Sequence, residues 1–178
     1  MLYLLTGHVQ CGKTTALQRL CENFQAEDKS VYGVVSPGVF DAEGTKVAVN
    51  AQLYPSSETF LVGQKQANIS RSCCGNRIPW DFNEEAVDAV NKHFETYDGT
   101  ARVLVIDELG PLEINNNGGF LDPLNLLKRG PSACAPTTIV VVRHRLLGSL
   151  KALLADAWPE DEIKVVTPEN LEAEISLQ

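Results

Sequence analysis

The sequence alternates short apolar runs with segments in which apolar residues recur every three or four positions. The first apolar run, residues 1–6, predicts a buried strand, and residues 13–24 then carry apolar side chains at helical spacing. Residues 31–36 have the pattern of the next strand. Alternating strands and helices are typical of βα units, in which helices cover the faces of a mainly parallel sheet. We therefore expect an α/β fold.

The second half of the chain continues this alternation. A helix is predicted over residues 83–94, with Asn83 as its N-cap and two glutamates in its first turn. The following elements are expected to be strand, helix, strand, helix, strand and helix, over residues 102–106, 120–128, 137–142, 146–155, 163–166 and 168–175. The β-branched residues of 137–142 make that strand the clearest of the six.

The region between residues 37 and 62 has a different pattern. Short alternating pieces are separated by turn residues, which predicts a β-hairpin insertion in the main sheet. Residues 63–80 are polar and irregular, and a loop of that length is expected to be functional or mobile. The chain has 178 residues and no linker or internal repeat, so we expect one domain over residues 1–178.

A phosphate-binding loop is predicted between the first strand and the first helix. Residues 7–14 match the pattern G-x-x-x-x-G-K-[ST] in the setting that it requires. Gly7 and Gly12 permit backbone conformations that let successive N–H groups point at phosphate oxygens, and the helix N-terminus adds its dipole. Lys13 is expected to reach the β- and γ-phosphates, and the Thr14 hydroxyl to bind Mg²⁺. The predicted nucleotide-binding residues are Gly7, His8, Val9, Gln10, Cys11, Gly12, Lys13, Thr14 and Thr15.

Two carboxylates follow a later apolar strand. Residues 103–106 are apolar and lead into Asp107 and Glu108, which predicts a Walker B strand beside the phosphate-loop strand. Asp107 is expected to hold Mg²⁺ through a bound water, because this small cation prefers oxygen ligands and gives up its waters reluctantly. Glu108 is expected to orient or deprotonate the attacking water. Pro111 comes shortly afterwards and is expected to prevent a simple helical continuation, and Glu113 is expected to be structural.

Hydrolysis of a phosphoanhydride also needs positive charge against the transition state. The candidate arginines are Arg71 and Arg77 in the irregular loop and Arg143 and Arg145 after the strand 137–142. We favour Arg143, since it follows that strand directly and would project at the same sheet edge as Asp107. An ordinary surface salt bridge is the alternative role for Arg143.

Charge and cysteine content narrow the classes of partner. The formal net charge is −8, which disfavours binding to nucleic acid or anionic lipid and favours a small molecule such as a nucleoside triphosphate. The five cysteines form no C-x-x-C pair, which argues against both a disulfide framework and a zinc site, although adjacent Cys73 and Cys74 could form a redox-sensitive bond. No apolar run approaches a membrane span, and the start of the chain does not resemble a signal peptide, so a cytoplasmic protein is expected.

Beyond these motifs, most of the chain resembles the small nucleoside triphosphatases called thermophile-type or cancer-related nucleoside triphosphatases. The resemblance rests on the phosphate loop, on Asp-Glu-Leu-Gly-Pro-Leu-Glu at 107–113, and on residues 32–37, 140–143 and 166–171. It implies a RecA-like fold and slow, Mg²⁺-dependent hydrolysis of ATP, GTP and other nucleoside triphosphates to diphosphate and phosphate. Two departures are Gln10, where the family's loop usually has a third glycine, and residues 38–40, where it often has an acidic-x-Arg element.

Two other functions are compatible with these motifs. The arginines of the 63–80 loop would suit a nucleotide or small-molecule kinase, in which they close over a phosphorylated acceptor. The loops around the site would suit a nucleotide-dependent switch that binds a partner, although no particular protein partner is predicted. The guanine-reading N-K-x-D element is absent, since Asn91-Lys92 is followed by His93-Phe94, so the base preference stays open.

Overall fold

The computed structural model describes residues 1–65, 80–116 and 118–176. Within these residues one sheet runs in the order β6-β5-β4-β2-β7-β8-β1-β9, and β3 pairs with β4 at its side. Its parallel half consists of β2 (Val31–Val35), β7 (Val103–Leu109), β8 (Thr137–Val142), β1 (Leu2–Leu5) and β9 (Ile163–Val166). This half contains every strand predicted for the main sheet.

The other half of the sheet is antiparallel. It consists of β3 (Gly38–Phe40), β4 (Lys46–Tyr54), β5 (Thr59–Lys65) and β6 (Trp80–Phe82), and β4 joins it to β2. Gly63 to Lys65 pair with β6, so both ends of the predicted 63–80 loop belong to strands. Gln64 and Lys65 are exposed and polar, which explains why hydrophobicity alone did not indicate a strand there. Residues 66–79, which include Arg71, Cys73, Cys74 and Arg77, lie outside the described residues.

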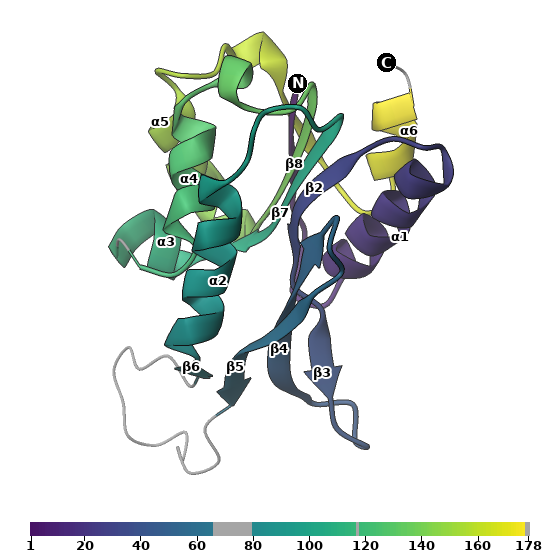
Figure 1. Ribbon diagram of the computed structural model, residues 1–178, viewed down its shortest axis with the longest axis vertical. Coiled ribbons are helices and arrows are strands. Elements are labelled where there is room, and N and C mark those ends of the chain that lie inside the picture. Colours follow the sequence, from purple (N-terminus) through teal and green to yellow (C-terminus); the bar gives the residue numbers. More distant parts are fainter. Residues whose placement is uncertain (66–79, 117, 177–178) are drawn as a thin grey trace.

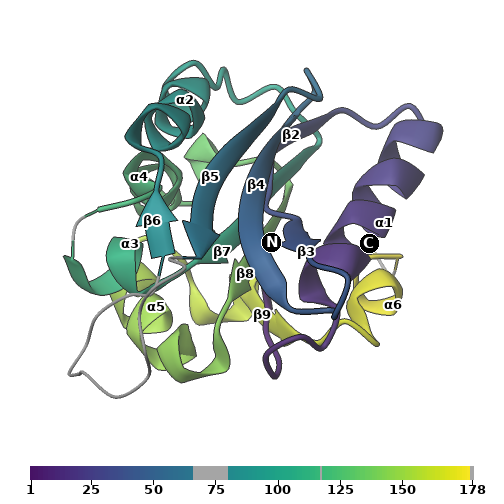
Figure 2. The ribbon, with the colours of Figure 1, turned by 90° about the horizontal axis from the view of Figure 1, so that it is seen from below.

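Helices cover both faces of the sheet (Figures 1 and 2). One face carries α1 (Lys13–Ala26) and α6 (Leu171–Ser176). The opposite face carries α2 (Glu84–Glu95), α4 (Leu121–Lys128) and α5 (Leu147–Leu154), with the short α3 (Pro111–Asn116) following β7. This three-layer arrangement confirms the predicted α/β fold with a mainly parallel sheet flanked by helices. In the described part of the chain, no helix is both long enough and apolar enough to span a membrane.

The first strand shows how the sequence produces these layers. Leu2 and Leu4 belong to the core cluster under α2, α4 and α5, whereas Tyr3 and Leu5 belong to the cluster under α1. All four side chains are fully buried because side chains alternate between the faces and both faces are covered. The continuous apolar run at the start of the chain is therefore typical of a strand buried between two layers of helices.

Helix boundaries follow local signals in some places and not in others. The Asn83 side chain accepts a hydrogen bond from Ala86 N at 3.2 Å, as expected of an N-cap at the start of α2. The prediction for Pro111 was wrong, since α3 begins at this residue. Proline is tolerated in the first turn of a helix, because the N–H that it lacks would have no intrahelical partner there.

The order of the parallel strands also differs from the prediction. Strand β8 lies between β1 and β7, with Val140 opposite both Leu4 and Ile106, so the acidic strand is not adjacent to the phosphate-loop strand. All three strands are buried and apolar, and their hydrophobic patterns contain no information about which of them are neighbours. Because β8 separates β1 from β7, it also separates the candidate phosphate loop after β1 from Asp107 and Glu108 on β7.

Candidate nucleotide site

The candidate residues gather at one edge of the parallel half of the sheet. Because β1, β2, β7, β8 and β9 run in the same direction, their carboxyl ends lie along a common edge. Gly7, Ser36, Asp107, Arg143 and Pro168 lie at or just after these strand ends. Open α/β sheets bind their ligands in the crevice outside the carboxyl ends of the strands. The topology therefore brings together residues that are far apart in the sequence.

The phosphate loop has the backbone conformation that its glycines make possible. Gly7 has a φ of 152° and Gly12 a φ of 86°. A Cβ added at Gly7 would lie only 2.7 Å from the Cys11 sulfur, so a larger residue would require the Cys11 side chain to move. Gln10 also adopts the left-handed region, with a φ of 62°. The residue that replaces the family's third glycine therefore keeps a glycine-like conformation, at a cost of about 1–2 kcal/mol for a residue with a side chain.

The start of α1 presents backbone donors to the loop. Gly12 is the N-cap residue, and no side chain from the described residues caps this end of the helix. The first N–H groups of a helix have no intrahelical acceptor, and the helix dipole favours an anion beside them. This end of α1 therefore has the donors that phosphate binding requires.

Lys13 lies across the loop rather than in solvent. Its Nζ donates hydrogen bonds to the carbonyl oxygens of Gly7 at 3.2 Å and His8 at 2.7 Å, and it lies 3.6 Å from the Cys11 sulfur. The tip of the loop is open, with Val9 86% exposed and Thr15 exposed at the start of the helix. The ammonium group is thus held close to the backbone that is predicted to surround the phosphates.

Asp107 is a fully buried carboxylate near the carboxyl end of β7. Its Oδ2 accepts a hydrogen bond from Ser36 N at 2.9 Å, and the Ser36 hydroxyl donates to the Asp107 carbonyl at 3.3 Å. Burial raises the pKa of Asp107 from 3.8 to about 7, while the Ser36 N–H and the Thr14 hydroxyl act in the opposite direction. Sequence reasoning assigned no role to Ser36, and its position directly after the apolar residues 31–35 was the available signal.

The second oxygen of Asp107 distinguishes this carboxylate from a merely structural one. Oδ1 is buried and has no hydrogen-bond partner in the part of the chain that the structure describes. The Thr14 hydroxyl is near enough to influence the Asp107 pKa. A hard divalent cation prefers such oxygen ligands, so the pair fits a cation site completed by the substrate. Within the same described residues, no group of three or more His, Cys, Asp and Glu side chains could hold a metal by itself.

Glu108 and Arg143, predicted as base and charge stabiliser, form an ion pair with each other. Arg143 donates from Nη2 at 2.5 Å and from Nε at 3.1 Å to the same oxygen, Oε1 of Glu108. Glu108 has a φ of 67°, and the pairing of β7 with β8 is irregular after Ile106. Both side chains are partly exposed, and such pairs contribute only about 0–1 kcal/mol to stability. The pair thus orients the Glu108 carboxylate far more than it stabilises the fold.

Glu113 holds the segment that follows Glu108. Its two carboxylate oxygens accept hydrogen bonds from Gly110 N at 2.7 Å and Phe120 N at 3.0 Å, and the side chain is buried. These bonds connect the residue before α3 with the N-cap residue of α4, in agreement with the structural role expected for Glu113. Of the other candidate arginines, Arg145 is exposed in the 3₁₀ turn His144–Leu146, and Arg71 and Arg77 lie outside the described residues.

These features define a class of protein. A glycine loop after a buried strand, a helix N-terminus that no described side chain caps and a buried aspartate at the same edge are typical of P-loop nucleotide-binding proteins. The chain belongs to the NTPase family, whose sequence model matches residues 2–173. The resemblance found in the sequence is therefore confirmed. No sequence among the curated proteins matches this chain.

Two solved structures share the fold. The solution structure of a human cancer-related nucleoside triphosphatase is 16% identical, with a TM-score of 0.65, and the match covers 99% of this chain and 95% of that one. The crystal structure of THEP1 from the hyperthermophile Aquifex aeolicus is 20% identical, with a TM-score of 0.64, and the match covers 99% and 98% of the two chains. At such low identity these matches show a common fold over nearly the whole chain.

Proposed function

We propose that this protein hydrolyses nucleoside 5′-triphosphates, ATP and GTP among them, to nucleoside diphosphate and phosphate in a Mg²⁺-dependent reaction. Membership of the NTPase family supports hydrolysis as the general reaction. The single observation that carries the finer proposal is the buried Oδ1 of Asp107, which lies near Thr14 and has no hydrogen-bond partner among residues 1–65, 80–116 and 118–176. An unsatisfied buried carboxylate oxygen is costly, and a ligand that binds it compensates for that cost.

In this proposal the phosphate loop binds the β- and γ-phosphates. The backbone N–H groups between Gly7 and Thr14 donate to phosphate oxygens, and Lys13 exchanges its two carbonyl acceptors for charged ones. Hydrogen bonds between charged partners are roughly twice as strong as those between neutral groups. The exchange is therefore favourable when the triphosphate binds.

The Thr14 hydroxyl and Asp107 would hold Mg²⁺, with Asp107 acting through a bound water. When bound, the cation would neutralise charge on the phosphate oxygens. Ser36 keeps Asp107 in place through its N–H and hydroxyl, which leaves Oδ1 as the oxygen available for this contact.

Glu108 would orient the attacking water and accept its proton. Arg143 donates to Oε1 only, and a carboxylate has a second oxygen that can accept from water. Arg143 thereby fixes the direction of Glu108, and its other N–H groups can stabilise charge that develops on the terminal phosphoryl group. A carboxylate can serve either water or an alcohol, and membership of the NTPase family supports water as the acceptor.

Phosphate release tests this proposal directly. We expect purified protein to release phosphate from ATP, GTP, CTP and UTP with Mg²⁺, and release to stop when EDTA is added. Lys13→Ala serves as the control for contaminating phosphatases and is expected to be inactive. Negligible release from every nucleotide would contradict the proposal, and release that required a co-substrate which itself became phosphorylated would identify a kinase instead.

A further inference from the structure

The side chain of Lys46 runs along the β3–β4 hairpin toward the candidate nucleotide site. Lys46 is the first residue of β4 and pairs with Phe40 at the end of β3. Its Cε lies only 2.9 Å from the position that a Cβ on Gly38 would occupy. Gly38 is the first residue of β3 and is nearer to β2 along the chain than Phe40, so Lys46 extends back toward the end of β2. Because Gly38 has no side chain, it leaves space for this course.

This course brings the Lys46 ammonium close to Asp107. Gly38 follows Ser36 by two positions, and the Ser36 N–H donates to Asp107 Oδ2 at 2.9 Å. Burial raises the pKa of Asp107, and the Lys46 charge is among the groups that act in the opposite direction. A positive charge favours the ionised form of a carboxylate in this way when it is nearby. The packing along the hairpin and the charge at Asp107 therefore agree on where the Lys46 ammonium lies.

The described residues give the Lys46 ammonium a weak partner. In that part of the chain, Lys46 forms no ion pair with a carboxylate. Its Nζ lies 6.0 Å from the centre of the Trp80 ring, at the outer limit of a cation–π contact. The side chain is partly buried, so part of its hydration is already lost. Such a group gains more from binding an anion than a fully solvated lysine does.

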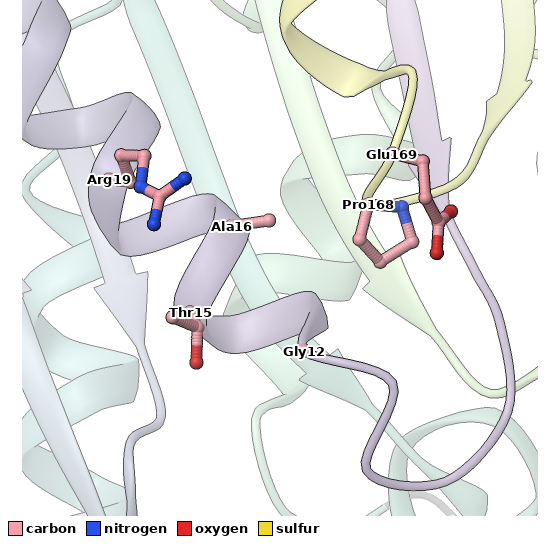
Figure 3. A pocket seen from close by; sticks show the side chains of 6 residues that line it. All are labelled: Gly12, Thr15, Ala16, Arg19, Pro168 and Glu169. Atoms are coloured by element: carbon pink, nitrogen blue, oxygen red, sulfur yellow. The ribbon is translucent and has the colours of Figure 1, made fainter.

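Lys46 and the phosphate loop lie on opposite sides of Asp107. Strands β2 and β4 follow β7 in one direction across the sheet, and β8 and β1 follow it in the other. A cavity of about 320 Å³ lies beyond the loop, between the start of α1 and the segment after β9, and it has space for the rest of the nucleotide (Figure 3). In the proposed reaction the terminal phosphoryl group lies nearest to Glu108. Lys46 is therefore at the terminal end of the triphosphate.

We propose that Lys46 binds the terminal phosphoryl group of the substrate, from the side opposite Lys13. The inference rests on the proposed function and adds to it a residue that distinguishes a triphosphate from a diphosphate. The lysine ammonium has three donors on a flexible stem, so it can follow the phosphoryl group as its bond to the diphosphate breaks. The nucleoside diphosphate product lacks this group. Lys46 thus holds the substrate more tightly than the product.

Binding of a triphosphate and of a diphosphate tests the proposal. Isothermal titration calorimetry with Mg²⁺ would give the Kd of a non-hydrolysable ATP analogue and of ADP for the unmodified protein and for Lys46→Ala. Loss of a hydrogen-bonded charge is expected to weaken binding of the analogue about tenfold to hundredfold and to leave that of ADP within about twofold. Lys128→Ala is the matched control and should change neither Kd, because Lys128 is exposed in the last turn of α4, which leads to the start of β8 at the opposite edge of the sheet.

Gly38 gives a second way to disturb the same contact. Gly38→Val keeps the ammonium but puts a side chain where the Lys46 stem lies. It is expected to weaken binding of the analogue about threefold or more in the unmodified protein and to add nothing to Lys46→Ala, because the two substitutions remove one contact. Lys46→Arg keeps the charge and should recover part of the affinity. Circular dichroism and the Tm would show whether each variant is folded.

The outcomes separate this inference from the proposed function. Equal weakening of ADP and of the analogue in Lys46→Ala would make Lys46 a general phosphate contact and overturn the inference. Unchanged binding of the analogue would also overturn it, and a lower Tm with unchanged binding would assign Lys46 a structural role only. If Lys46→Ala did not fold, an unaltered Kd of the analogue in Gly38→Val would decide against the inference. Absence of analogue binding in the unmodified protein would instead refute the proposed function itself.

Discussion

The two halves of the sheet differ in what their strands can bring together. The parallel half is covered by helices on both faces, and the ends of its strands carry every described residue to which the proposed reaction gives a role. The antiparallel half adds Lys46, which lies at the amino end of its strand, and exposes large apolar side chains, with Phe40 52% and Phe82 40% exposed. Parallel strands direct all their carboxyl ends to one edge, whereas antiparallel strands direct neighbouring ends to opposite edges. The direction of the strands, rather than their amino-acid composition, thus determines at which edge of the sheet a site can form.

The largest expected effect is at the carboxyl end of β7. Glu108→Gln removes the proposed base and should slow phosphate release by ~10²–10⁴, since general-base catalysis contributes about that much. Nucleotide binding should stay nearly unchanged, because the phosphate loop is intact. Turnover and the Kd of a non-hydrolysable ATP analogue would be measured in parallel. Unchanged turnover would remove Glu108 from the proposed mechanism.

The end of β8 should give the next largest effect. Arg143→Ala removes both the donor that orients Glu108 and the positive charge, and about 10²-fold slower hydrolysis is expected. Arg143→Lys should recover part of this activity, since it keeps the charge without the fork. Arg145→Ala is the control, because Arg145 is also exposed and lies two positions away. Equal losses at the two positions would indicate a general field effect rather than a specific contact.

Asp107 should make stability depend on pH in an unusual direction. Its pKa of about 7 in the fold is above the ordinary value of 3.8, so the folded state binds more protons between these values than the unfolded state does. Stability without Mg²⁺ should therefore fall as pH rises from about 4 to about 7. Asp107→Asn cannot ionise, and above pH 7 without Mg²⁺ its Tm is expected to exceed that of the unmodified protein by at least about 2 °C.

Thermal unfolding at several pH values, with and without Mg²⁺, would measure this difference. Mg²⁺ added together with a non-hydrolysable ATP analogue should raise the Tm of the unmodified protein above pH 7 by more than it raises that of Asp107→Asn, because a bound cation favours the charged carboxylate. An Asp107→Asn variant with the same pH profile as the unmodified protein would show that another group dominates.

The smallest effect is expected for an exposed apolar side chain of the antiparallel half. Phe40→Ser replaces an exposed side chain on β3 and should change kcat and KM by less than about twofold and stability by about 0.5 kcal/mol or less. The same phosphate-release and unfolding measurements apply. A loss of activity comparable with that of Arg143→Ala would give Phe40 a role in the reaction and contradict the division described above.

The sequence was most informative where one local rule decides the structure. The apolar run of β1, the helical spacing of α1 and the cap at Asn83 predicted their elements, because burial and capping depend on neighbouring residues. The conformation of the phosphate loop followed from its glycines in the same way. The fold class and the family could therefore be identified without the structure.

Contacts between distant segments could not be predicted in this way. The position of β8 between β1 and β7 depends on a choice among three equally apolar strands. The pairing of Arg143 with Glu108 depends on that choice and on the irregular end of β7. The bond from Ser36 to Asp107 depends instead on the pairing of β2 with β7. The sequence thus predicted candidate residues for a site, but not the contacts among them.

The strand β8 also sets the distance between the carboxyl ends of β1 and β7. Adjacent strands in a sheet are about 4.8 Å apart, so a strand between β1 and β7 separates their ends by roughly 10 Å. In the proposed mechanism such a gap would leave space for a water molecule and an arginine between the loop and Glu108. Without β8, the proposed base would lie against the bound phosphates, where like charges repel, and one additional strand would put the attacking water beyond its reach.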